Sequence, residues 1–384
     1  MRPVYVVHAR RTPIGRFGGG LKSRSAADLA LAAAEATVPE ALRSALDQVI
    51  LGQVLPAGCG MNVARQMALR LGVPQSVPAF MVNMVCGSGL KAVALGADAI
   101  AAGESDLVLC GGTESMSSAP HYLRGLRWGH KLGDSGAEDS IFADGLTDPL
   151  LKIGMGETAE KLVDRFAIGR AEQDAFALQS QLRAVAAREA FRREIVPVTT
   201  KEGTVTDDEH PRSDTTLEKL GSLKPAFRKD GSVTAGNASG INDGAAVCLL
   251  ASEDALARHQ LKPLARIVAT TAAGCDPAEM GLGPVGAIRR LWQRTGWNAD
   301  QVDAFEINEA FAVQTLACIR ELHLDPAKVN LRGGAIALGH PVGASGARVL
   351  VTLLHLMEDE GLARGVASLC IGGGMGIAMG VERV

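Results

Sequence analysis

Aromatic side chains are scarce in this sequence, and neither sign of charge is in excess. Phe, Trp and Tyr make up 4% of the residues, with only 2 Tyr. Lys and Arg number 39 against 42 Asp and Glu, so the formal net charge is −3. A protein that binds nucleic acid or an anionic membrane surface through general electrostatics needs a basic excess. The balanced charge therefore argues against nucleic acid and membranes as partners.

The sequence also lacks paired cysteines, a secretory leader and long apolar runs. Its 7 Cys are an odd, scattered set without a CxxC pair. That is unlike a disulfide framework or a zinc knuckle and is typical of a reducing compartment. Arg10 and Arg11 follow a strand-like stretch rather than precede an apolar leader. Since we find no run near the roughly 20 apolar residues that span a bilayer, we expect a soluble cytoplasmic protein.

What the sequence does contain is typical of a large α/β protein. Hydrophobic residues account for 47% of the chain, enough for a large core, and 45 Gly indicate tight turns and close backbone approach. Short β-branched runs alternate with Ala- and Leu-rich amphipathic runs. This alternation predicts strands at 4–8, 48–55, 79–85 and 106–110, and helices at 26–36, 63–71 and 88–102.

The pattern changes near residue 113 and returns near residue 242. Between these points Gly, Ser, His, Asp and Pro surround two charged helices, predicted at 157–166 and 170–190. Strands are predicted again at 245–251 and 265–271. We therefore expect a first core domain from residues 1–115 plus 242–264, an inserted loop domain at 116–241, and a second core domain at 265–384.

The two core segments resemble each other. Residues 89–112 read as a helix followed by Asp-Leu-Val-Leu-Cys-Gly-Gly, and residues 344–373 as a helix followed by Val-Ala-Ser-Leu-Cys-Ile-Gly-Gly. This repeat is too long for a solenoid and indicates two similar domains packed about a pseudo-twofold axis. A site between them would draw residues from both halves.

Two reactive side chains stand at Gly-rich junctions that lead into helices. Cys86 lies between a predicted strand and a helix, where amide N–H groups and the helix dipole favour a thiolate. His340 lies in the Gly-dense stretch 333–346, where a neutral imidazole can take a proton from a nearby thiol. Each also has a plainer interpretation, a buried structural Cys and a hydrogen-bonded turn His.

Three weaker candidates lie at later strand ends. Cys370 precedes Gly372 and two more glycines, whose N–H groups can face a developing oxyanion or simply form a hairpin turn. Asn308 and Glu309 follow a predicted strand at 302–307. They fit a helix N-cap and a first-turn acid, or alternatively an oxyanion ligand and a residue that orients a neighbouring His.

Taken together, these residues resemble the signature segments of the thiolase family. The resemblance runs in order over nearly the whole chain, and its blocks are 11–19, 83–90, 234–246, 308–312, 333–346 and 370–376. It implies an α/β fold with a thiolase-like, duplicated αβαβα layered core and an inserted loop domain.

The resemblance also implies a reaction. Thiolases interconvert a 3-ketoacyl-CoA plus CoA with two shorter acyl-CoAs by way of an acyl-cysteine. Cys86 would be the acylated nucleophile, His340 its activator, and Cys370 the acid and base for the α-carbon proton. Asn308 would hold a water that, with His340, stabilises the enolate oxygen. The N–H groups of Cys86 and Gly372 would form a second oxyanion hole.

Further residues take roles by the same resemblance. Glu309 would be an orienting residue. CoA enters as a substrate rather than a cofactor, and the inserted domain would form much of its tunnel. Arg212 near the adenine or phosphates and Ser239 match contact positions, and Met155 and Met280 match the acyl end. The plainer interpretations are a solvated surface charge for Arg212 and ordinary core packing for Met155 and Met280. No metal is expected.

One departure bears on the substrate. Many acetoacetyl-CoA thiolases carry Tyr-His before the residue matched by Met155, whereas this chain has Gly154 there. The missing His would change how the thioester is held or leave room for longer acyl chains. Residues 86–91 and 237–242 are nevertheless closer to the acetyl-CoA acetyltransferase branch. We therefore expect conversion of two acetyl-CoA to acetoacetyl-CoA plus CoA, with a broad-range 3-ketoacyl-CoA thiolase of fatty acid β-oxidation as the alternative.

Other classes of protein fit the residues less well. A decarboxylating ketosynthase resembles a Cys-His-His arrangement, and here the third position is Cys370. A non-enzymatic acyl-CoA-binding relative would be expected to lose a reactive residue, and none is lost. A metal site from Cys86, His340 and Cys370 has suitable ligand types but no local ligand spacing.

The assembly is expected only by resemblance. Trp128, Leu132 and Ile141 fall where the family has an assembly loop, which implies a homotetramer built as a dimer of dimers.

Overall fold

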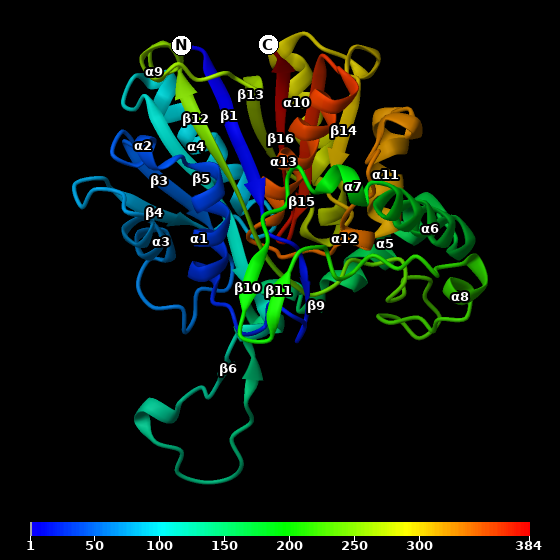
Figure 1. The fold of residues 1–384 in the computed structure, drawn as a ribbon. Helices are drawn as coiled ribbons and strands as arrows, with labels where there is room; N and C mark the ends of the chain where they lie inside the picture. The colour runs from blue at the N-terminus through cyan, green and yellow to red at the C-terminus, as the bar shows by residue number, and fades with distance from the viewer. Residues whose placement is uncertain (1) are drawn as a thin grey trace.

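One mixed ten-stranded sheet runs through the computed structural model, which describes residues 2–384 (Figure 1). Its first half consists of β1 (Val4–Arg11), β2 (Gly15–Arg16), β3 (Gln48–Gly52), β4 (Ala79–Val82), β5 (Leu107–Ser115) and β12 (Asn242–Ser252). Its second half consists of β13 (Ala265–Gly274), β14 (Ala304–Ile307), β15 (Arg364–Ile371) and β16 (Met375–Arg383). The order is β14-β15-β16-β13-β1-β12-β5-β3-β4, with β2 beside β12.

The two halves of the sheet repeat one pairing pattern. In the first half β4, β3 and β5 are parallel, and β5, β12 and β1 follow antiparallel. In the second half β14 and β15 are parallel, and β15, β16 and β13 follow antiparallel. The equivalent strands β1 and β13 pair antiparallel where the halves meet. The predicted duplication is therefore present in the sheet.

Helices form the other layers. α1 (Ala26–Thr37) and α3 (Val63–Leu71) pack on the first half, and α10 (Gly283–Thr295) and α11 (Ala312–Leu322) pack in the apolar cluster of the second. The central pair, α4 (Ser88–Ala102) and α13 (Ser345–Glu360), contact each other and strands of both halves. The shorter helices are α2 (Glu40–Arg43), α9 (Glu253–His259) and α12 (Ala335–Leu338).

The central helix α4 corrects one expectation from the sequence. The window Val85–Ala102 has a mean hydropathy of 1.4 and is long and apolar enough, by length and composition, to cross a membrane. In the fold this helix contacts β3, β5 and α13, and 56% of the window is buried. A helix enclosed on several sides is apolar all round, so its position in the core accounts for its composition.

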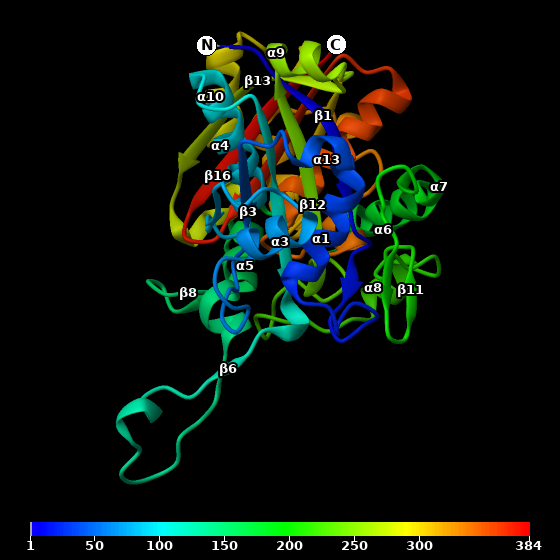
Figure 2. The same cartoon turned by 60° about the vertical axis from the view of Figure 1, so that its left-hand side comes forward.

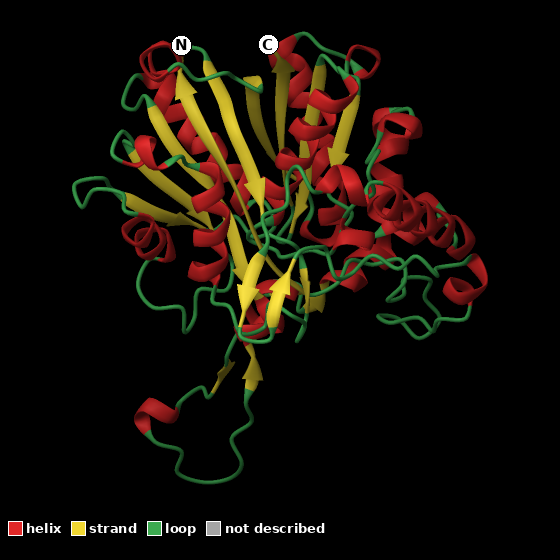
Figure 3. Cartoon of the chain, viewed as in Figure 1, coloured by secondary structure: helices red, strands yellow, loops and turns green. Residues whose placement is uncertain are grey.

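The inserted segment leaves and rejoins the first half between β5 and β12. Its helices are α5 (Met155–Phe166), α6 (Arg170–Ala186), α7 (Arg188–Phe191) and α8 (Leu217–Gly221), and its strand pairs are β6 (His121–Tyr122) with β7 (Glu138–Asp139), β8 (Thr147–Asp148) with β9 (Ile153–Gly154), and β10 (Val198–Thr200) with β11 (Gly203–Val205). The loop between β6 and β7 extends far from the body in both views (Figures 1 and 2). Much of the inserted segment is loop (Figure 3).

Several predicted elements have different limits in the structure; the predicted strand at 48–55, for example, ends at Gly52, and that at 106–110 extends to Ser115. The predicted strand at 79–85 ends at Val82, and as the edge strand β4 it is half-exposed rather than buried. The predicted helix at 170–190 is divided, because α6 ends at Ala186 and α7 begins at Arg188. At the end of β4 the chain turns sharply after Val82, and Val85 takes a φ of 45°.

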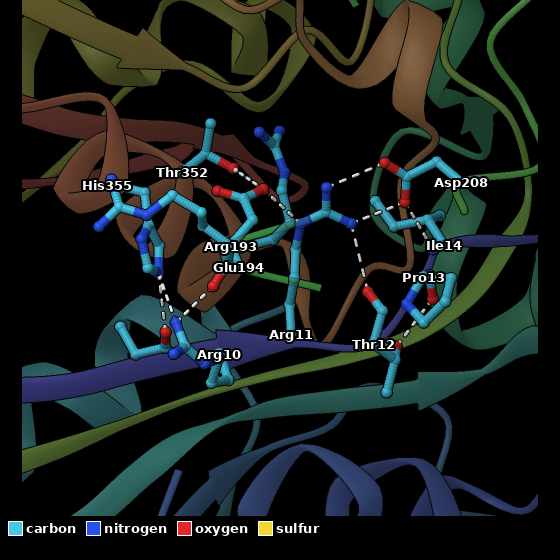
Figure 4. A network of polar contacts seen from close by, with 12 residues as sticks. Arg10, Arg11, Thr12, Pro13, Ile14, Arg193, Glu194, Asp208, Thr352 and His355 are labelled. Atoms are coloured by element: carbon cyan, nitrogen blue, oxygen red, sulfur yellow. Dashed lines mark hydrogen bonds and ion pairs between the residues drawn. The ribbon is translucent and has the colours of Figure 1, made fainter. Parts of the chain in front are cut away.

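A buried ionic network joins the inserted segment to both halves of the core (Figure 4). Arg11, at the end of β1, donates to Glu194 at 2.6 Å and to both carboxylate oxygens of Asp208 at 2.6 and 2.9 Å. Thr352 of α13 donates to the same Glu194 at 3.1 Å. Removing one partner from such a buried network commonly costs about 3–5 kcal/mol. The network therefore fixes the insertion on the core.

Candidate active site

Cys86 lies in a tight turn between β4 and α4. The turn is closed by Asn83, whose side-chain oxygen accepts from the N–H of Val85 at 2.9 Å, and by Ser88, which donates to the Val85 carbonyl at 2.6 Å and accepts from the N–H of Met84 at 2.8 Å. Val85 adopts a left-handed φ of 45°, which is uncommon for a β-branched residue. Such strain is typical of functional sites, and here it directs the Cys86 side chain away from the strand path.

The electrostatic environment of Cys86 differs from the sequence expectation. Burial raises the pKa of the Cys86 thiol to about 11, and the N–H of Gly372, donating to the sulfur, opposes that shift without cancelling it. The backbone amides do lower the pKa of this thiol, as the sequence predicts, but burial has the larger effect and the resting thiol is protonated. Desolvation outweighs the amide dipoles, so this thiol needs a base to become a nucleophile.

His340 offers such a base. Burial lowers the pKa of His340 to about 3, with a smaller contribution from the charge of Arg348, so the ring is neutral. Its Nδ1 lies 2.6 Å from the hydroxyl of Ser345, which donates its single hydrogen to the carbonyl of Pro341 at 2.9 Å. The hydroxyl must then accept from Nδ1–H. Nε2 is left unprotonated, and it has no partner within residues 2–384.

Ser345→Ala tests this assignment of the tautomer. The change leaves a buried Nδ1–H without an acceptor and lets the proton move to Nε2, where it blocks base catalysis. If His340 is the base that the sequence motifs imply, kcat should fall roughly ten- to hundredfold, in line with ~1–3 kcal/mol for a buried unsatisfied group. Thr37→Val is the matched control, because Thr37 is a buried hydroxyl that donates to a carbonyl four residues back in α1. Equal losses in both variants would contradict the role of Ser345.

Cys370 is buried near the end of β15, in an apolar cluster with Met280, Ala310 and Phe311. Burial, and to a smaller extent the proximity of Cys86, raises the pKa of the Cys370 thiol well above its ordinary value. The strand ends at Ile371, and the glycine turn that follows brings the N–H of Gly372 onto the Cys86 sulfur.

Asn308 is not an N-cap, which corrects one interpretation of its sequence position. The following helix α11 begins only at Ala312, with Phe311 as its N-cap. The Asn308 side chain is fully buried, and both its oxygen and its nitrogen lack a partner in the part of the chain that the structure describes. A buried amide with free hydrogen-bonding capacity is suited to a water or a ligand oxygen.

Glu309 forms no hydrogen bond to His340 among those of residues 2–384. Its carboxylate accepts from Ser180 at 2.6 Å, from Asn330 at 2.8 Å and from the backbone N–H of Ile336 at 3.2 Å. It therefore holds the stretch that leads into the His340 loop. Gly334 permits this approach, because a Cβ there would lie 2.3 Å from the Glu309 carboxyl carbon.

The loops that carry these residues converge through glycines. A Cβ at Gly87 would lie 2.5 Å from the Ile371 side chain, and one at Gly89 would lie 2.7 Å from the Ala347 nitrogen. The start of α4 therefore packs directly on the end of β15 and the start of α13. Val342, two residues after His340, shares an apolar cluster with Cys86. Cys86, His340 and Cys370 are thus brought together from both halves.

A cleft of about 530 Å³ opens beside the Cys86 turn. Met155, at the start of α5, lines it, and a Cβ on Gly372 would lie 3.3 Å from its sulfur. Met280 lies instead in the Cys370 cluster. The other residues of the cleft come from both halves and from the insertion: Val54, Asn83, Val85, Ala143, Asp144, Gly145, Thr147, Asp148, Pro149, Gly372 and Gly373.

Arg212 and Ser239 lie farther along the insertion. The exposed Arg212 lines a second cleft, of about 180 Å³, together with Lys219, Ala235 and Gly236. Ser239 follows this stretch, and its N–H donates to the carbonyl of Ala310 at 3.0 Å. Ser239 is therefore held beside the loop that carries Asn308, whereas Arg212 lines the second cleft. Within residues 2–384, no hydrogen bond joins either of them to the Cys86 turn.

Sequence reasoning missed three polar residues that shape the site. Ser345 fixes the His340 ring, and the side chain of Asn242 accepts from the His340 backbone N–H at 2.8 Å. Glu114 lies buried at the end of β5 and accepts from backbone N–H groups on both sides of the site. Glu114 and Asn242 each lie at the polar end of an otherwise apolar strand, where the sequence alone does not distinguish them from ordinary strand-end residues. As for metals, residues 2–384 contain no group of three or more His, Cys, Asp or Glu placed to hold an ion.

Comparisons with known proteins agree with the motifs and the fold. The thiolase N-terminal domain matches residues 4–254, and the thiolase C-terminal domain matches residues 261–383. An acetyl-CoA acetyltransferase of Chromobacterium violaceum is 50% identical, with 99% of each chain covered.

Two solved structures are similar over almost their full lengths. The Bacillus anthracis acetyl-CoA acetyltransferase has a TM-score of 0.96 at 44% identity, covering 100% of this chain and 99% of that one. Human mitochondrial 3-ketoacyl-CoA thiolase in complex with CoA has a TM-score of 0.97 at 46% identity, covering 100% and 98%. Motifs, duplicated fold and relatives agree: the chain belongs to the thiolase family.

Proposed function

We propose that this thiolase catalyses the reversible conversion of two acetyl-CoA to acetoacetyl-CoA plus CoA, with Cys86 as the acylated residue. The observation that carries the proposal is the packing of the Cys86 turn, through glycines, against the loops of His340 and Cys370, with the N–H of Gly372 near the thiol. Relatives named acetyl-CoA acetyltransferases support the choice of substrate.

In the cleavage direction, His340 Nε2 accepts the Cys86 proton as the sulfur attacks the 3-keto carbon. The developing oxyanion takes hydrogen bonds from the N–H groups of Cys86 and Gly372. The C2–C3 bond then breaks, and its electron pair forms the enolate of acetyl-CoA. His340 and a water held by Asn308 stabilise the enolate oxygen, and the Cys370 thiol protonates C2.

Release of the acyl group restores the resting thiols. The thiol of a second CoA gives its proton to the Cys370 thiolate and attacks the Cys86 thioester. Collapse of the tetrahedral intermediate gives acyl-CoA, and Cys86 regains its proton from His340. Two thiols are needed because one carries the acyl group while the other exchanges a carbon-bound proton.

We assign CoA binding to the path through the insertion. Arg212 at the mouth of the second cleft suits the phosphates or adenine, and Ser239 suits the pantetheine arm. Met155 lines the cleft beside the Cys86 turn, which supports a role at the acyl end, and we extend this proposal to Met280, which packs in the Cys370 cluster. CoA serves as a substrate, and we propose that no separate cofactor is required. Full activity after dialysis against EDTA supports this, and loss of activity that a metal restores contradicts it.

A second candidate is a 3-ketoacyl-CoA thiolase of broad chain length. The cleft beside Cys86, at about 530 Å³, falls in the range of pockets for drug-sized ligands and exceeds the needs of an acetyl group. A Cβ at Gly154, next to Met155, would lie 3.5 Å from the nearest atom, a Glu157 carboxylate oxygen. Space therefore remains where a side chain would stand.

Thiolysis of 3-ketoacyl-CoAs of increasing chain length decides between the two candidates, with Cys86→Ala as the blank. The proposal predicts the highest kcat/KM for acetoacetyl-CoA and a decline with length. A kcat/KM that rises with length identifies the broad-range enzyme, in which Gly154 makes room. CoA binding without any turnover would contradict both candidate activities and favour a non-enzymatic acyl-CoA-binding protein.

We also propose a homotetramer formed as a dimer of dimers. The loop between β6 and β7 carries exposed apolar residues, with Trp128 85% and Leu132 92% exposed. Ile141, by contrast, is buried in an apolar cluster with Leu55 and Met116. The edge strand β4 offers a second apolar surface, with Phe80 exposed. Light scattering of the purified protein tests this proposal, and a monomeric mass would contradict it.

Place and pathway follow as proposals from the sequence. The scattered free cysteines suit a reducing compartment, and we propose a cytoplasmic enzyme without nucleic-acid or membrane partners. In the broad-range case its pathway would be fatty acid β-oxidation. Cell fractionation followed by the thiolysis assay tests the location, and activity confined to membranes would contradict it.

A further inference from the structure

Glu114 is a fully buried carboxylate that has no part in the steps above. It lies near the end of β5, and its Oε2 accepts from the N–H of Val54 at 2.9 Å and from the N–H of Gly343 at 3.0 Å. Its Oε1 accepts from the N–H of Leu55 at 3.2 Å. One carboxylate thus joins the segment after β3, in the first half, to the loop that carries His340, in the second.

The link continues to the Cys86 turn. The carbonyl of Val54 accepts from the side chain of Asn83 at 3.4 Å, and Asn83 in turn closes the turn that presents Cys86. An unbroken chain of hydrogen bonds therefore leads from the Cys86 turn through Val54 and Glu114 to Gly343 of the His340 loop.

Gly343 fits this bridge closely. A Cβ there would lie 2.6 Å from Glu114 Oε2 and 2.7 Å from the carbonyl of Thr113. On the other side, a Cβ at Gly112 would lie 2.1 Å from the Gly343 carbonyl. Backbone and carboxylate therefore meet with no space for adjustment, so the length of the Glu114 side chain sets the position of the loop.

We propose that Glu114 is a positioning residue that holds the His340 loop in register with the Cys86 turn. The inference rests on the proposed roles of Cys86 and His340. Burial raises the pKa of Glu114 to about 7, and its three N–H donors oppose that shift, so the bridge is tested near pH 8. Displacing a catalytic base by about 1 Å can cost on the order of a hundredfold in rate.

Two substitutions separate the effect of the Glu114 side-chain length from the effect of its charge. Glu114→Gln keeps the length, and its single oxygen can still accept from Val54 and Gly343. Glu114→Asp keeps the charge but is one methylene too short to span the two segments. We expect kcat for thiolysis to fall about ten- to hundredfold in Glu114→Asp, with KM for CoA unchanged, and to change by less than about threefold in Glu114→Gln.

A second readout does not depend on turnover. The rate of Cys86 alkylation by iodoacetamide, without substrate, should fall in Glu114→Asp and stay near wild type in Glu114→Gln, because His340 promotes thiolate formation only when it is in register. If the wild type proved unable to cleave any 3-ketoacyl-CoA, the proposed function would fail, while alkylation would still test Glu114.

The opposite ranking, with Glu114→Gln impaired and Glu114→Asp active, would overturn the proposal in favour of a charge effect on Cys86. Unchanged kcat in both variants with a lowered Tm would also overturn it, since Glu114 would then only stabilise the fold. Asp243→Asn is the matched control: Asp243 is equally buried on the neighbouring β12, binds Ser117, and should keep wild-type kcat. Should Glu114→Asp not fold, Gly343→Ala decides, with the same losses expected and wild-type kcat and alkylation contradicting the bridge.

Discussion

Replacing Cys86 with Ser should reduce thiolysis by about 10⁴-fold or more and prevent an acyl-enzyme from accumulating. Burial raises the pKa of the Cys86 thiol to about 11 and lowers the pKa of His340, so the proton must pass to His340 as the sulfur attacks and negative charge develops beside the imidazolium. A Ser hydroxyl is far less acidic and a poorer leaving group, so both acyl transfers slow. Single-turnover kinetics with acetoacetyl-CoA measures the loss.

Cys59→Ser is the control for this variant. Cys59 is a partly exposed thiol in the first half of the core, and its sulfur accepts a hydrogen bond from the Gln53 side chain at 3.3 Å. It should keep wild-type turnover. If Cys59→Ser lost as much activity as Cys86→Ser, or if Cys86→Ser still formed a thioester at another cysteine, Cys86 would not be the nucleophile.

Replacing Cys370 with Ala should separate the two halves of the reaction. Exchange of label between acetyl-CoA and CoA moves no proton at C2, because His340 passes the proton it takes from Cys86 to the departing CoA thiolate and returns it in the reverse step. Cys370 stays a thiol throughout, so exchange should remain within a few fold of wild type. Condensation and thiolysis need a proton at C2 and should fall by about 10²–10⁴-fold, the usual contribution of a general acid or base. Both rates are measurable on one preparation.

Cys318→Ala is the matched control for that experiment. Cys318 is also fully buried, but it donates to the carbonyl of Gly281 at 3.2 Å in the second-half core. It should preserve both exchange and condensation. Wild-type condensation in Cys370→Ala would contradict the second-thiol role, and loss of exchange would mean that the variant had distorted the Cys86 site.

The local sequence pattern predicted helices and strands correctly where burial was uniform along the element. Helices at 63–71 and 88–102 were placed at their observed ends, because Asn62 and Gly72 bound the first and glycines flank the second. The edge position of β4 was not predictable, since an apolar run has the same sequence in the middle or at the edge of a sheet. The start of α11 was also misplaced, because Asn308 forms a loop set by tertiary contacts.

The site residues that could be predicted from the sequence are reactive side chains in glycine-rich segments. Cys86, His340 and Cys370 each lie beside glycines, which the structure needs for the close approach of loops. The effect of backbone amides on the Cys86 pKa was predictable, but the net direction of the shift was not, because burial cannot be inferred from the sequence. Glu114 was missed because its three hydrogen bonds join residues about 60 and 229 positions away in the chain.

Peptide mapping of wild-type protein quenched during turnover of acetoacetyl-CoA tests the central claim most directly. The account predicts one acetyl group per chain, held as a hydroxylamine-sensitive thioester on the peptide that contains Cys86, and its loss when CoA is added. An acetyl group on another residue, or turnover with no acyl-enzyme under conditions that trap thioesters, would contradict it.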